Sequence, residues 1–288
     1  MITVLPIMNT NPSNPDGTGE KQGSVHSALT QIGRIRRQIR HKKPALFLDY
    51  DGTLTPIVSQ PDNAVLSAEM RQLIAQLAQL CPVGIISGRE RLDVQQRVNL
   101  DNIIYAGSHG FDVVGPDNLH LTSRKGDEFL PALDKAGKKL AGLLTDVPKS
   151  LIEPKKFSIA VHYRNVPEKY LHRIEPAVDN VISQTKGLRK RCGKKVFELQ
   201  PDVEWDKGRA LLWLLEKLDL NGKEIIPFYI GDDITDEDAF DALKQKGITI
   251  LVGPEEQPTK AAYRLKNPAE VKIFLTKLIL LVKAEKVK

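Results

Sequence analysis

Two aspartates, Asp49 and Asp51, end a short apolar segment and precede Gly52 and Thr53. Side chains alternate along an extended strand, so both carboxylates can point the same way before Gly52 allows a sharp turn. A carboxylate is ionised at neutral pH and needs no base to act as a nucleophile. Two carboxylates this close repel each other unless a cation such as Mg²⁺ or a shared proton intervenes. The pair indicates nucleophilic chemistry, with Asp49 as the nucleophile.

Ser87, Gly88 and Arg89 follow a second apolar segment. A hydroxyl beside free backbone N–H groups at a helix start can hold a phosphoryl oxygen, although Ser-Gly is also common in ordinary turns. Lys207 opens another helix, where the positive end of the helix dipole disfavours a cation unless an anion lies nearby. We therefore predict that Ser87, Gly88 and Lys207 bind phosphate and that Lys207 faces Asp49.

Five acidic residues lie within seven positions after a third apolar segment, at Asp232, Asp233 and 236–238. Their mutual repulsion favours a hard divalent cation with oxygen ligands. Asp236 and Glu237 can instead cap the next helix and complement its dipole. We predict that Asp232 and Asp233 bind the metal, and that part of the remainder caps the helix.

Together these groups fit one reaction on a phosphate ester. Asp49 attacks phosphorus, Mg²⁺ and Lys207 neutralise the equatorial oxygens, and Ser87 positions them. Asp51 protonates the leaving alkoxide and then takes a proton from the water that attacks the aspartyl phosphate. The predicted catalytic residues are Asp49, Asp51 and Lys207.

Short apolar strands alternate with amphipathic helices between these motifs, which predicts an α/β fold with a parallel sheet and helices on both faces. The middle of the chain breaks this rhythm and predicts a small inserted α+β module. We expect a disordered leader at 1–23, a core at 24–112 plus 201–288, and a cap at 113–200. The predicted strands are 45–48, 82–86, 103–106, 158–163, 195–199, 225–230 and 248–252, and the predicted helices are 24–39, 67–80, 127–146, 167–184, 207–218, 236–244 and 269–282.

The net charge of +6 suggests a nucleic-acid ligand only until its distribution is considered. Two acidic blocks, 49–112 and 201–276, flank a basic block, 113–200, which holds 17 basic and ten acidic side chains. The two blocks that carry the aspartate motifs are thus acidic, as a metal-binding cluster requires, and the basic cap suits an anionic substrate. Hydrophobic residues make up 41% of the chain, and no apolar run approaches the length of a membrane span.

The four motifs, in this order, resemble those of the haloacid dehalogenase (HAD) superfamily of phosphohydrolases. Within that superfamily, the chain from about residue 39 to 281 is similar to trehalose-6-phosphate phosphatases. The resemblance implies a Rossmann-like core with an inserted α/β cap, and Mg²⁺ held by Asp49, the backbone carbonyl of Asp51 and Asp232. It also implies hydrolysis of trehalose 6-phosphate to trehalose and phosphate. The narrower similarity rests on segments 86–89, 107–110, 161–164, 196–199, 205–208 and 231–237.

The same resemblance implies that side chains around the cap grip the second glucose ring. Carboxylates accept hydrogen bonds from sugar hydroxyls, and lysine or arginine donates them. Matched position by position, the sugar-binding residues are Arg89 and His109 from the core and Glu153, Lys155, Arg164, Lys194 and Glu198 from the cap.

A sugar phosphate is therefore the expected substrate, supplied by a separate trehalose-6-phosphate synthase, and neither nucleic acid nor a membrane is an expected partner. The two cysteines fit a reducing compartment, so we expect a cytoplasmic protein. Three alternatives stay open: another glycosyl phosphate as substrate (sucrose 6-phosphate or mannosyl-3-phosphoglycerate), a non-catalytic sugar-phosphate sensor, and a nucleic-acid binder. The complete catalytic set disfavours the sensor, and the lack of zinc-finger or RNP motifs disfavours the nucleic-acid binder.

Overall fold

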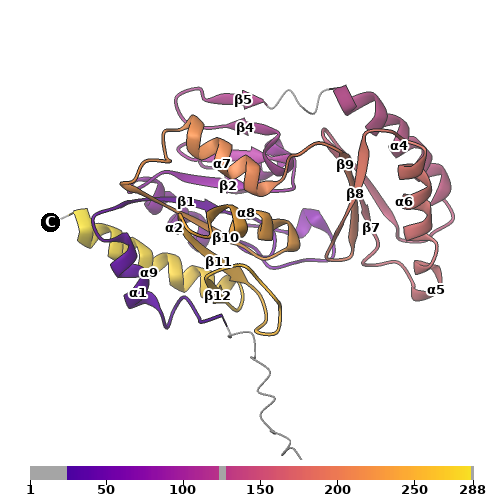
Figure 1. Cartoon of the computed structure of the whole chain (residues 1–288). Helices are drawn as coiled ribbons and strands as arrows, with labels where there is room; N and C mark the ends of the chain where they lie inside the picture. Colours follow the sequence, from indigo (N-terminus) through magenta and orange to yellow (C-terminus); the bar gives the residue numbers. More distant parts are fainter. Residues whose placement is uncertain (1–24, 123–127, 287–288) are drawn as a thin grey trace, which may run out of the picture.

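The computed structural model describes residues 25–122 and 128–286, which form a core and a cap (Figure 1). The predicted leader, 1–23, lies outside the described residues. The core holds an eight-stranded sheet in the order β12-β11-β10-β1-β2-β3-β4-β5. Its strands from β12 to β3 are parallel, and β4 and β5 are antiparallel. The strands are β1 (Lys43–Leu48), β2 (Val83–Ile86), β3 (Ile104–Gly107), β4 (Asp112–Val114), β5 (His120–Thr122), β10 (Ile225–Gly231), β11 (Ile248–Val252) and β12 (Tyr263–Leu265).

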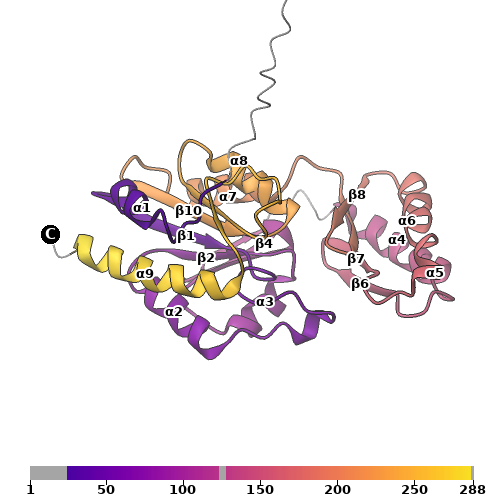
Figure 2. The ribbon, with the colours of Figure 1, turned by 90° about the horizontal axis from the view of Figure 1, so that it is seen from below.

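Helices cover both faces of this sheet, as the alternation of strands and helices predicts (Figure 2). On one face, Leu211 and Leu214 of α7 pack with Phe47 of the central strand β1. On the other face, Ile74 of α2 and Phe274 of α9 belong to a larger hydrophobic cluster. The helices of the core are α1 (Ile32–Ile39), α2 (Ala68–Ala78), α3 (Arg91–Val98), α7 (Lys207–Lys217), α8 (Glu237–Leu243) and α9 (Pro268–Lys286), with short 3₁₀ turns η1 (Pro61–Asn63), η2 (Ser108–Gly110) and η4 (Ile234–Asp236).

The cap is a four-stranded antiparallel sheet in the order β6-β7-β9-β8, with α4 and α6 packed against it. Buried side chains, among them Leu140, Val161, Val178 and Leu199, give the cap a hydrophobic cluster of its own. It therefore has the interior of a separate folding unit. Its elements are α4 (Leu130–Leu143), β6 (Leu151–Lys155), β7 (Ser158–His162), α5 (Glu168–Leu171), α6 (Ile174–Ser183), β8 (Leu188–Gly193) and β9 (Val196–Pro201).

Two of the four cap strands were not predicted from the sequence. The central strands β7 and β9 match the predicted strands 158–163 and 195–199, whereas β6 and β8 lie at the edges of the sheet. β6 contains Pro154 and has no fully buried residue. Proline is tolerated in edge strands, and a strand exposed in this way lacks the apolar pattern that sequence analysis detects.

The core extends further into the chain than predicted. The short strands β4 and β5 pair in succession onto β3 and carry the core sheet to Thr122, beyond the boundary expected at residue 112. The first helix also begins later than predicted, at Ile32, because Ser27 forms a β-bridge to Arg264. Helix α3 and strand β12 were not predicted.

Helix α9 closes the core on the face that carries α2 (Figure 2). Its apolar side, which includes Val271, Phe274 and Leu278, is buried as predicted, while Leu280 is 64% exposed. Among residues 25–122 and 128–286, no helix combines the length and the apolar character that crossing a bilayer requires.

Replacing Leu278 by alanine should lower the free energy of unfolding by about 2–5 kcal/mol, because the side chain leaves a cavity in a packed interior. Leu280→Ala removes the same atoms from the exposed side of α9 and should change stability by less than about 0.5 kcal/mol. Urea denaturation of both variants measures the difference, and equal losses would contradict this packing.

Candidate active site

Three neighbouring parallel strands end at the same edge of the core sheet and deliver three of the predicted site residues. Asp49 follows β1, Ser87 follows β2 and Asp232 follows β10, and these strands lie side by side. Ligands of open α/β sheets bind outside the carboxyl ends of the strands. Tyr50 points the opposite way into the hydrophobic cluster, so the predicted alternation across this strand end is confirmed.

Lys207 reaches this edge from the first turn of α7 and is almost completely buried. Its Nζ donates to Oδ1 of Asp49 at 2.8 Å and to Oδ1 of Asp236 at 2.7 Å. A cation at a helix N-terminus opposes the helix dipole, and these two carboxylates offset that cost. The predicted contact between Lys207 and Asp49 is therefore confirmed.

The structure gives Asp236 the inward position that the sequence analysis predicted for Asp233. The Asp233 carboxylate accepts a hydrogen bond from the next backbone N–H and caps η4. Asp236 is fully buried. Its Oδ2 accepts hydrogen bonds from the backbone N–H groups of Asp232 and Asp233, both at 2.9 Å. Its Oδ1 also accepts the Tyr229 hydroxyl at 2.7 Å. Asp236 therefore braces the loop that carries Asp232, a role for which its sequence position gives no signal.

The buried carboxylates carry more negative charge than their surroundings stabilise. Burial raises the pKa of Asp49 well above its usual value, although Lys207 counteracts this. Burial also raises the pKa of Asp232 to about 7, against the opposite effect of Lys194. For Lys207, burial alone lowers the pKa, but Asp236 and Asp49 outweigh it and raise the pKa well above its usual value. The cluster would therefore be stabilised by a further cation.

The donor set of this cluster fits such a cation. Asp49, Asp232 and Asp236 are buried, and each offers a carboxylate oxygen that lies within 4.8 Å of the other two. Gly52 has a φ of +80°, and a Cβ there would overlap the Asp232 carboxylate, so glycine keeps this space open. Hard divalent cations prefer oxygen ligands of this kind.

Ser87 and Gly88 line the same edge. The Ser87 Oγ accepts the backbone N–H of Arg89 at 3.1 Å, which leaves its hydroxyl hydrogen for a phosphoryl oxygen. The Gly88 carbonyl accepts a hydrogen bond of 3.2 Å from Nζ of the cap residue Lys155. Ser87 is thus placed for the predicted phosphate contact, whereas the Gly88 carbonyl ties the cap to the core.

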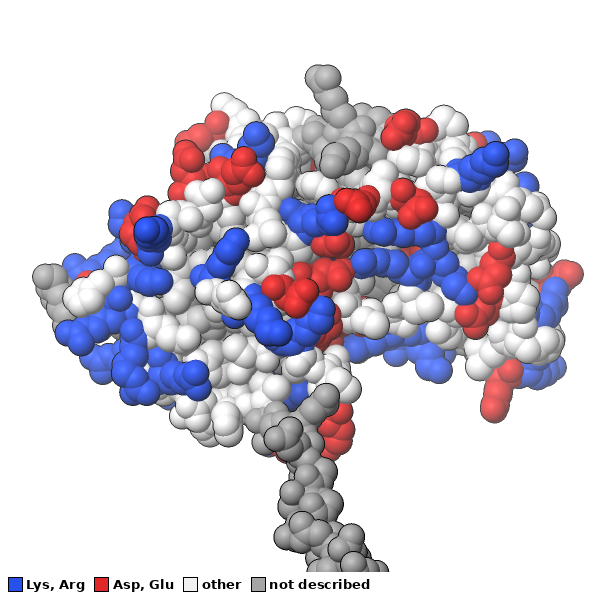
Figure 3. Space-filling view, in the orientation of Figure 1, with Lys and Arg blue, Asp and Glu red and all other residues white. Residues whose placement is uncertain are grey.

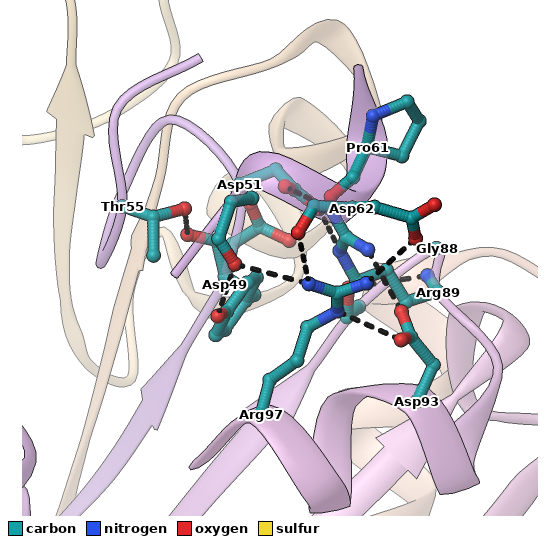
Figure 4. A network of polar contacts seen from close by, with 12 residues as sticks. Asp49, Asp51, Thr55, Pro61, Asp62, Gly88, Arg89, Asp93 and Arg97 are labelled. Carbon is teal, nitrogen blue, oxygen red and sulfur yellow. Dashed lines mark hydrogen bonds and ion pairs between the residues drawn. The ribbon is translucent and has the colours of Figure 1, made fainter. Parts of the chain in front are cut away.

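Asp51 and Arg89 form a two-pronged ion pair at the edge of the site (Figure 4). Nε and Nη2 of Arg89 donate to Oδ2 and Oδ1 of Asp51 at 2.6 and 2.8 Å. The remaining donors of the guanidinium reach Asp93 at 2.7 Å and the Pro61 carbonyl at 2.8 Å. The resemblance implied that Arg89 binds the sugar. In the structure its donors are directed at Asp51, Asp93 and the backbone instead.

Glu198 of the cap faces His109 of the core. Its Oε2 lies 2.9 Å from Nε2 of His109, and its Oε1 accepts the Ser158 hydroxyl at 2.7 Å. Burial by itself raises the pKa of Glu198, but His109 and Lys155 outweigh it and hold the pKa well below its usual value. Glu198 is therefore a carboxylate at the boundary between cap and core, as recognition of hydroxyl groups requires.

The other predicted sugar-binding residues surround the same opening from the cap. Lys194 donates to the carboxylate of Asp232 at 2.5 Å and to its backbone carbonyl at 2.8 Å. Arg164 donates to the backbone carbonyl of Lys194 at 2.6 Å. Glu153 lies 2.7 Å from Nε2 of His162. Figure 3 shows lysine and arginine side chains gathered over the cap, beside acidic side chains where the cap meets the core.

All predicted site residues line one cavity of about 770 Å³ between the cap and the core. The cavity brings residues separated by most of the chain into one place. The sequence analysis missed several lining residues, because they lie in loops and in the edge strands β6 and β8, without a recognisable motif. These are Ile57, Val58, Ser59, Gln60, Pro61, Asp62, Lys149, Ser150, Leu151, Asn165, Arg191, Cys192 and Gly193.

Comparison with known proteins agrees with this geometry. The profile of the family described as trehalose-phosphatase matches residues 47–269. The chain belongs to the trehalose-phosphatase family. It is 42% identical over 264 residues to "Probable trehalose-phosphate phosphatase D" of Arabidopsis thaliana, which covers 88% of this chain and 72% of that protein. It is also 42% identical over 240 residues to the trehalose-phosphate phosphatase of Mycobacterium ulcerans, covering 82% of this chain and 61% of that protein.

Solved structures show the same fold. A crystal structure of a trehalose-6-phosphate phosphatase related protein matches with a TM-score of 0.72 at 25% identity, covering 82% of this chain and 97% of that one. The C-terminal domain of the C. albicans trehalose-6-phosphate phosphatase matches with a TM-score of 0.77 at 21% identity, covering 91% of this chain and 99% of that one. A haloacid dehalogenase-like hydrolase from Bacteroides thetaiotaomicron also matches, with a TM-score of 0.58 at 15% identity, so the predicted HAD-like α/β fold is confirmed.

Adding Mg²⁺ should raise the melting temperature of the wild-type protein, because a cation offsets the repulsion in the buried cluster. Asp232→Asn removes one of the three clustered carboxylates and should abolish most of this shift. Asp233→Asn is the matched control, because asparagine keeps the ability to cap η4 and should retain the shift. Thermal denaturation with and without Mg²⁺ measures both, and loss of the shift in both variants would support the sequence-based assignment of Asp233 as a metal ligand.

Proposed function

We propose that this protein is a Mg²⁺-dependent phosphatase that hydrolyses trehalose 6-phosphate to trehalose and phosphate through an aspartyl phosphate. The observation that carries the proposal is the placement of Asp49. It lies at a strand end, is clamped by the buried Lys207 and opens onto a cavity that the cap covers. Membership of the trehalose-phosphatase family supports the substrate.

In the first step, a carboxylate oxygen of Asp49 attacks phosphorus, and the bond from phosphorus to the sugar oxygen breaks. Lys207 holds the Asp49 carboxylate in one orientation and places positive charge beside the phosphoryl group. Ser87 donates its hydroxyl hydrogen to a phosphoryl oxygen. Rigid placement of nucleophile and phosphoryl group lowers the entropic part of the barrier.

Asp51 handles the protons in both steps. It protonates the sugar oxygen as that oxygen leaves, and it then accepts a proton from the water that attacks the aspartyl phosphate. Asp49 is regenerated when the bond between its oxygen and phosphorus breaks, and phosphate is released. The two-residue spacing on one strand end places Asp51 next to Asp49 on the cavity side.

Asp49, the backbone carbonyl of Asp51 and Asp232 are the groups that we propose to hold Mg²⁺, whereas the Asp233 carboxylate caps η4. When bound, Mg²⁺ supplies positive charge that offsets the phosphate and the carboxylate cluster. Lys194 contacts the Asp232 carboxylate from the cap. The cap thereby adds its own positive charge to the same place.

The cavity suits a disaccharide phosphate. Its volume of about 770 Å³ falls within the range of about 300–1,000 Å³ that is usual for small-molecule sites. Glu153 and Glu198 can accept hydrogen bonds from sugar hydroxyls, and Lys155, Arg164 and Lys194 can donate them. We propose that these five cap residues, together with His109, recognise the glucose ring remote from the phosphate.

We also propose that a separate trehalose-6-phosphate synthase supplies the substrate and that the protein works in the cytoplasm. A phosphatase of this specificity needs a reaction that forms the sugar phosphate. Cys81 and Cys192 are both free thiols, as is usual in a reducing compartment.

Asp49→Asn should lower kcat for trehalose 6-phosphate by about 10⁴-fold or more, because an amide cannot form the acyl phosphate. Its far-ultraviolet circular dichroism should match the wild type. Phosphate release under saturating substrate and Mg²⁺ gives the rate. A variant that keeps more than about a tenth of the wild-type rate would contradict covalent catalysis by Asp49.

A panel of sugar phosphates tests the substrate assignment. The kcat/KM for trehalose 6-phosphate should exceed that for glucose 6-phosphate by at least about 100-fold, because glucose 6-phosphate lacks the second ring that the cap residues bind. Equal values for the two substrates would refute recognition of the second ring. A higher value for sucrose 6-phosphate or mannosyl-3-phosphoglycerate would assign the site to that ester instead.

A further inference from the structure

Asp51 is the first member of a chain of alternating charges that extends away from the cavity (Figure 4). Arg89 binds Asp51 on one side and Asp93 on the other, where Nη1 lies 2.7 Å from Oδ2. Arg97 then donates from Nε to Oδ1 of Asp93 at 2.7 Å and from Nη2 to Asp62 at 3.1 Å. Asp93 and Arg97 lie on α3, outside the set of residues that line the cavity.

Among the residues that the structure describes, only two carboxylates contact Arg89, those of Asp51 and Asp93. The Arg89 side chain is 9% exposed, and its guanidinium also lies 5.4 Å from the Tyr50 ring centroid. A guanidinium is planar and its donors form a fixed fork, so one contact at Nη1 helps to set the direction of Nε and Nη2. The position of Asp93 therefore influences the plane in which Asp51 is held.

Asp93 is held in place in turn. It sits in the first turn of α3, one helical turn before Arg97, so the two side chains meet on the same face of the helix. Arg97 also donates to the Asp62 and Ala64 backbone carbonyls at 3.0 and 3.3 Å. The network thus fixes the guanidinium of Arg89 between α3 and the loop that precedes α2.

We propose that Asp93, braced by Arg97, is a positioning residue for the proposed phosphatase reaction. It orients the Arg89 fork, which holds both oxygens of the Asp51 carboxylate and so fixes the plane in which that carboxylate lies beside the cavity. This inference rests on the proposed function, because it concerns the proton that Asp51 delivers in the first step. Asp93 itself contacts neither phosphate nor sugar.

The test compares two phosphate esters that differ in their leaving groups. The alkoxide of trehalose 6-phosphate needs a proton to leave, whereas the phenolate of p-nitrophenyl phosphate leaves without one. kcat/KM reports on the steps up to loss of the alcohol or phenol. Asp93→Asn should lower kcat/KM for trehalose 6-phosphate by about 10–100-fold and that for p-nitrophenyl phosphate by less than about threefold.

Arg97→Gln is the second variant and should shift the same ratio in the same direction by a smaller factor. Asp112→Asn is the matched control, because it breaks the ion pair between Arg91 of the same helix and Asp112, which does not contact Arg89. The control should leave the ratio of the two substrates unchanged within about twofold. Circular dichroism and melting temperature establish that each variant is folded.

Asp51→Asn, measured alongside, distinguishes a failure of the positioning role of Asp93 from a failure of the proposed acid role of Asp51. A selective loss on trehalose 6-phosphate in Asp51→Asn but not in Asp93→Asn or Arg97→Gln would overturn the positioning role and leave the proposed function intact. Equal losses on both esters in Asp51→Asn would overturn the acid role of Asp51 and the positioning role with it. Equal losses in Asp93→Asn alone would show a purely structural role and also overturn the inference.

Discussion

The buried contact of Lys207 with Asp49 and Asp236 is the interaction on which the rest of the site depends. It joins residues 158 positions apart in the sequence and brings α7 to the carboxyl ends of β1 and β10. Removing one partner of a buried ion pair typically costs about 3–5 kcal/mol, because a charge is left without compensation. The same contact fixes the orientation of the Asp49 carboxylate. Stability of this edge of the sheet and orientation of the proposed nucleophile therefore have one physical origin.

The cap also contributes charged side chains to this site. Lys194 reaches Asp232, and Glu198 faces His109, so opposite charges meet from both sides of the boundary between cap and core. The cavity therefore lies between basic side chains of the cap and a buried cluster of carboxylates in the core. The proposed specificity and the proposed catalysis thus draw on the same distribution of charge.

The sequence predicted well which side chains meet at this edge of the sheet, because strand-end motifs depend on local geometry. Asp49, Ser87 and Asp232 follow three buried strands, and parallel strands end at one edge. The partners of individual side chains were less predictable. Which of Asp233 and Asp236 turns inward depends on the η4 turn, and the sequence contains no signal for that choice. The contacts of Arg89 were not predicted either, because its partner Asp93 lies on α3 and that helix was not predicted. β6 escaped prediction because edge strands lack a buried face.

Trapping the covalent intermediate tests directly whether Asp49 is the nucleophile. The wild-type protein is quenched in acid during turnover of trehalose 6-phosphate with Mg²⁺, reduced with borohydride and digested for peptide mass spectrometry. An aspartyl phosphate is reduced to homoserine, so we expect homoserine at position 49 and an unchanged residue at position 51. Unmodified Asp49 in protein quenched during steady turnover, or modification at another side chain, would contradict nucleophilic attack by Asp49.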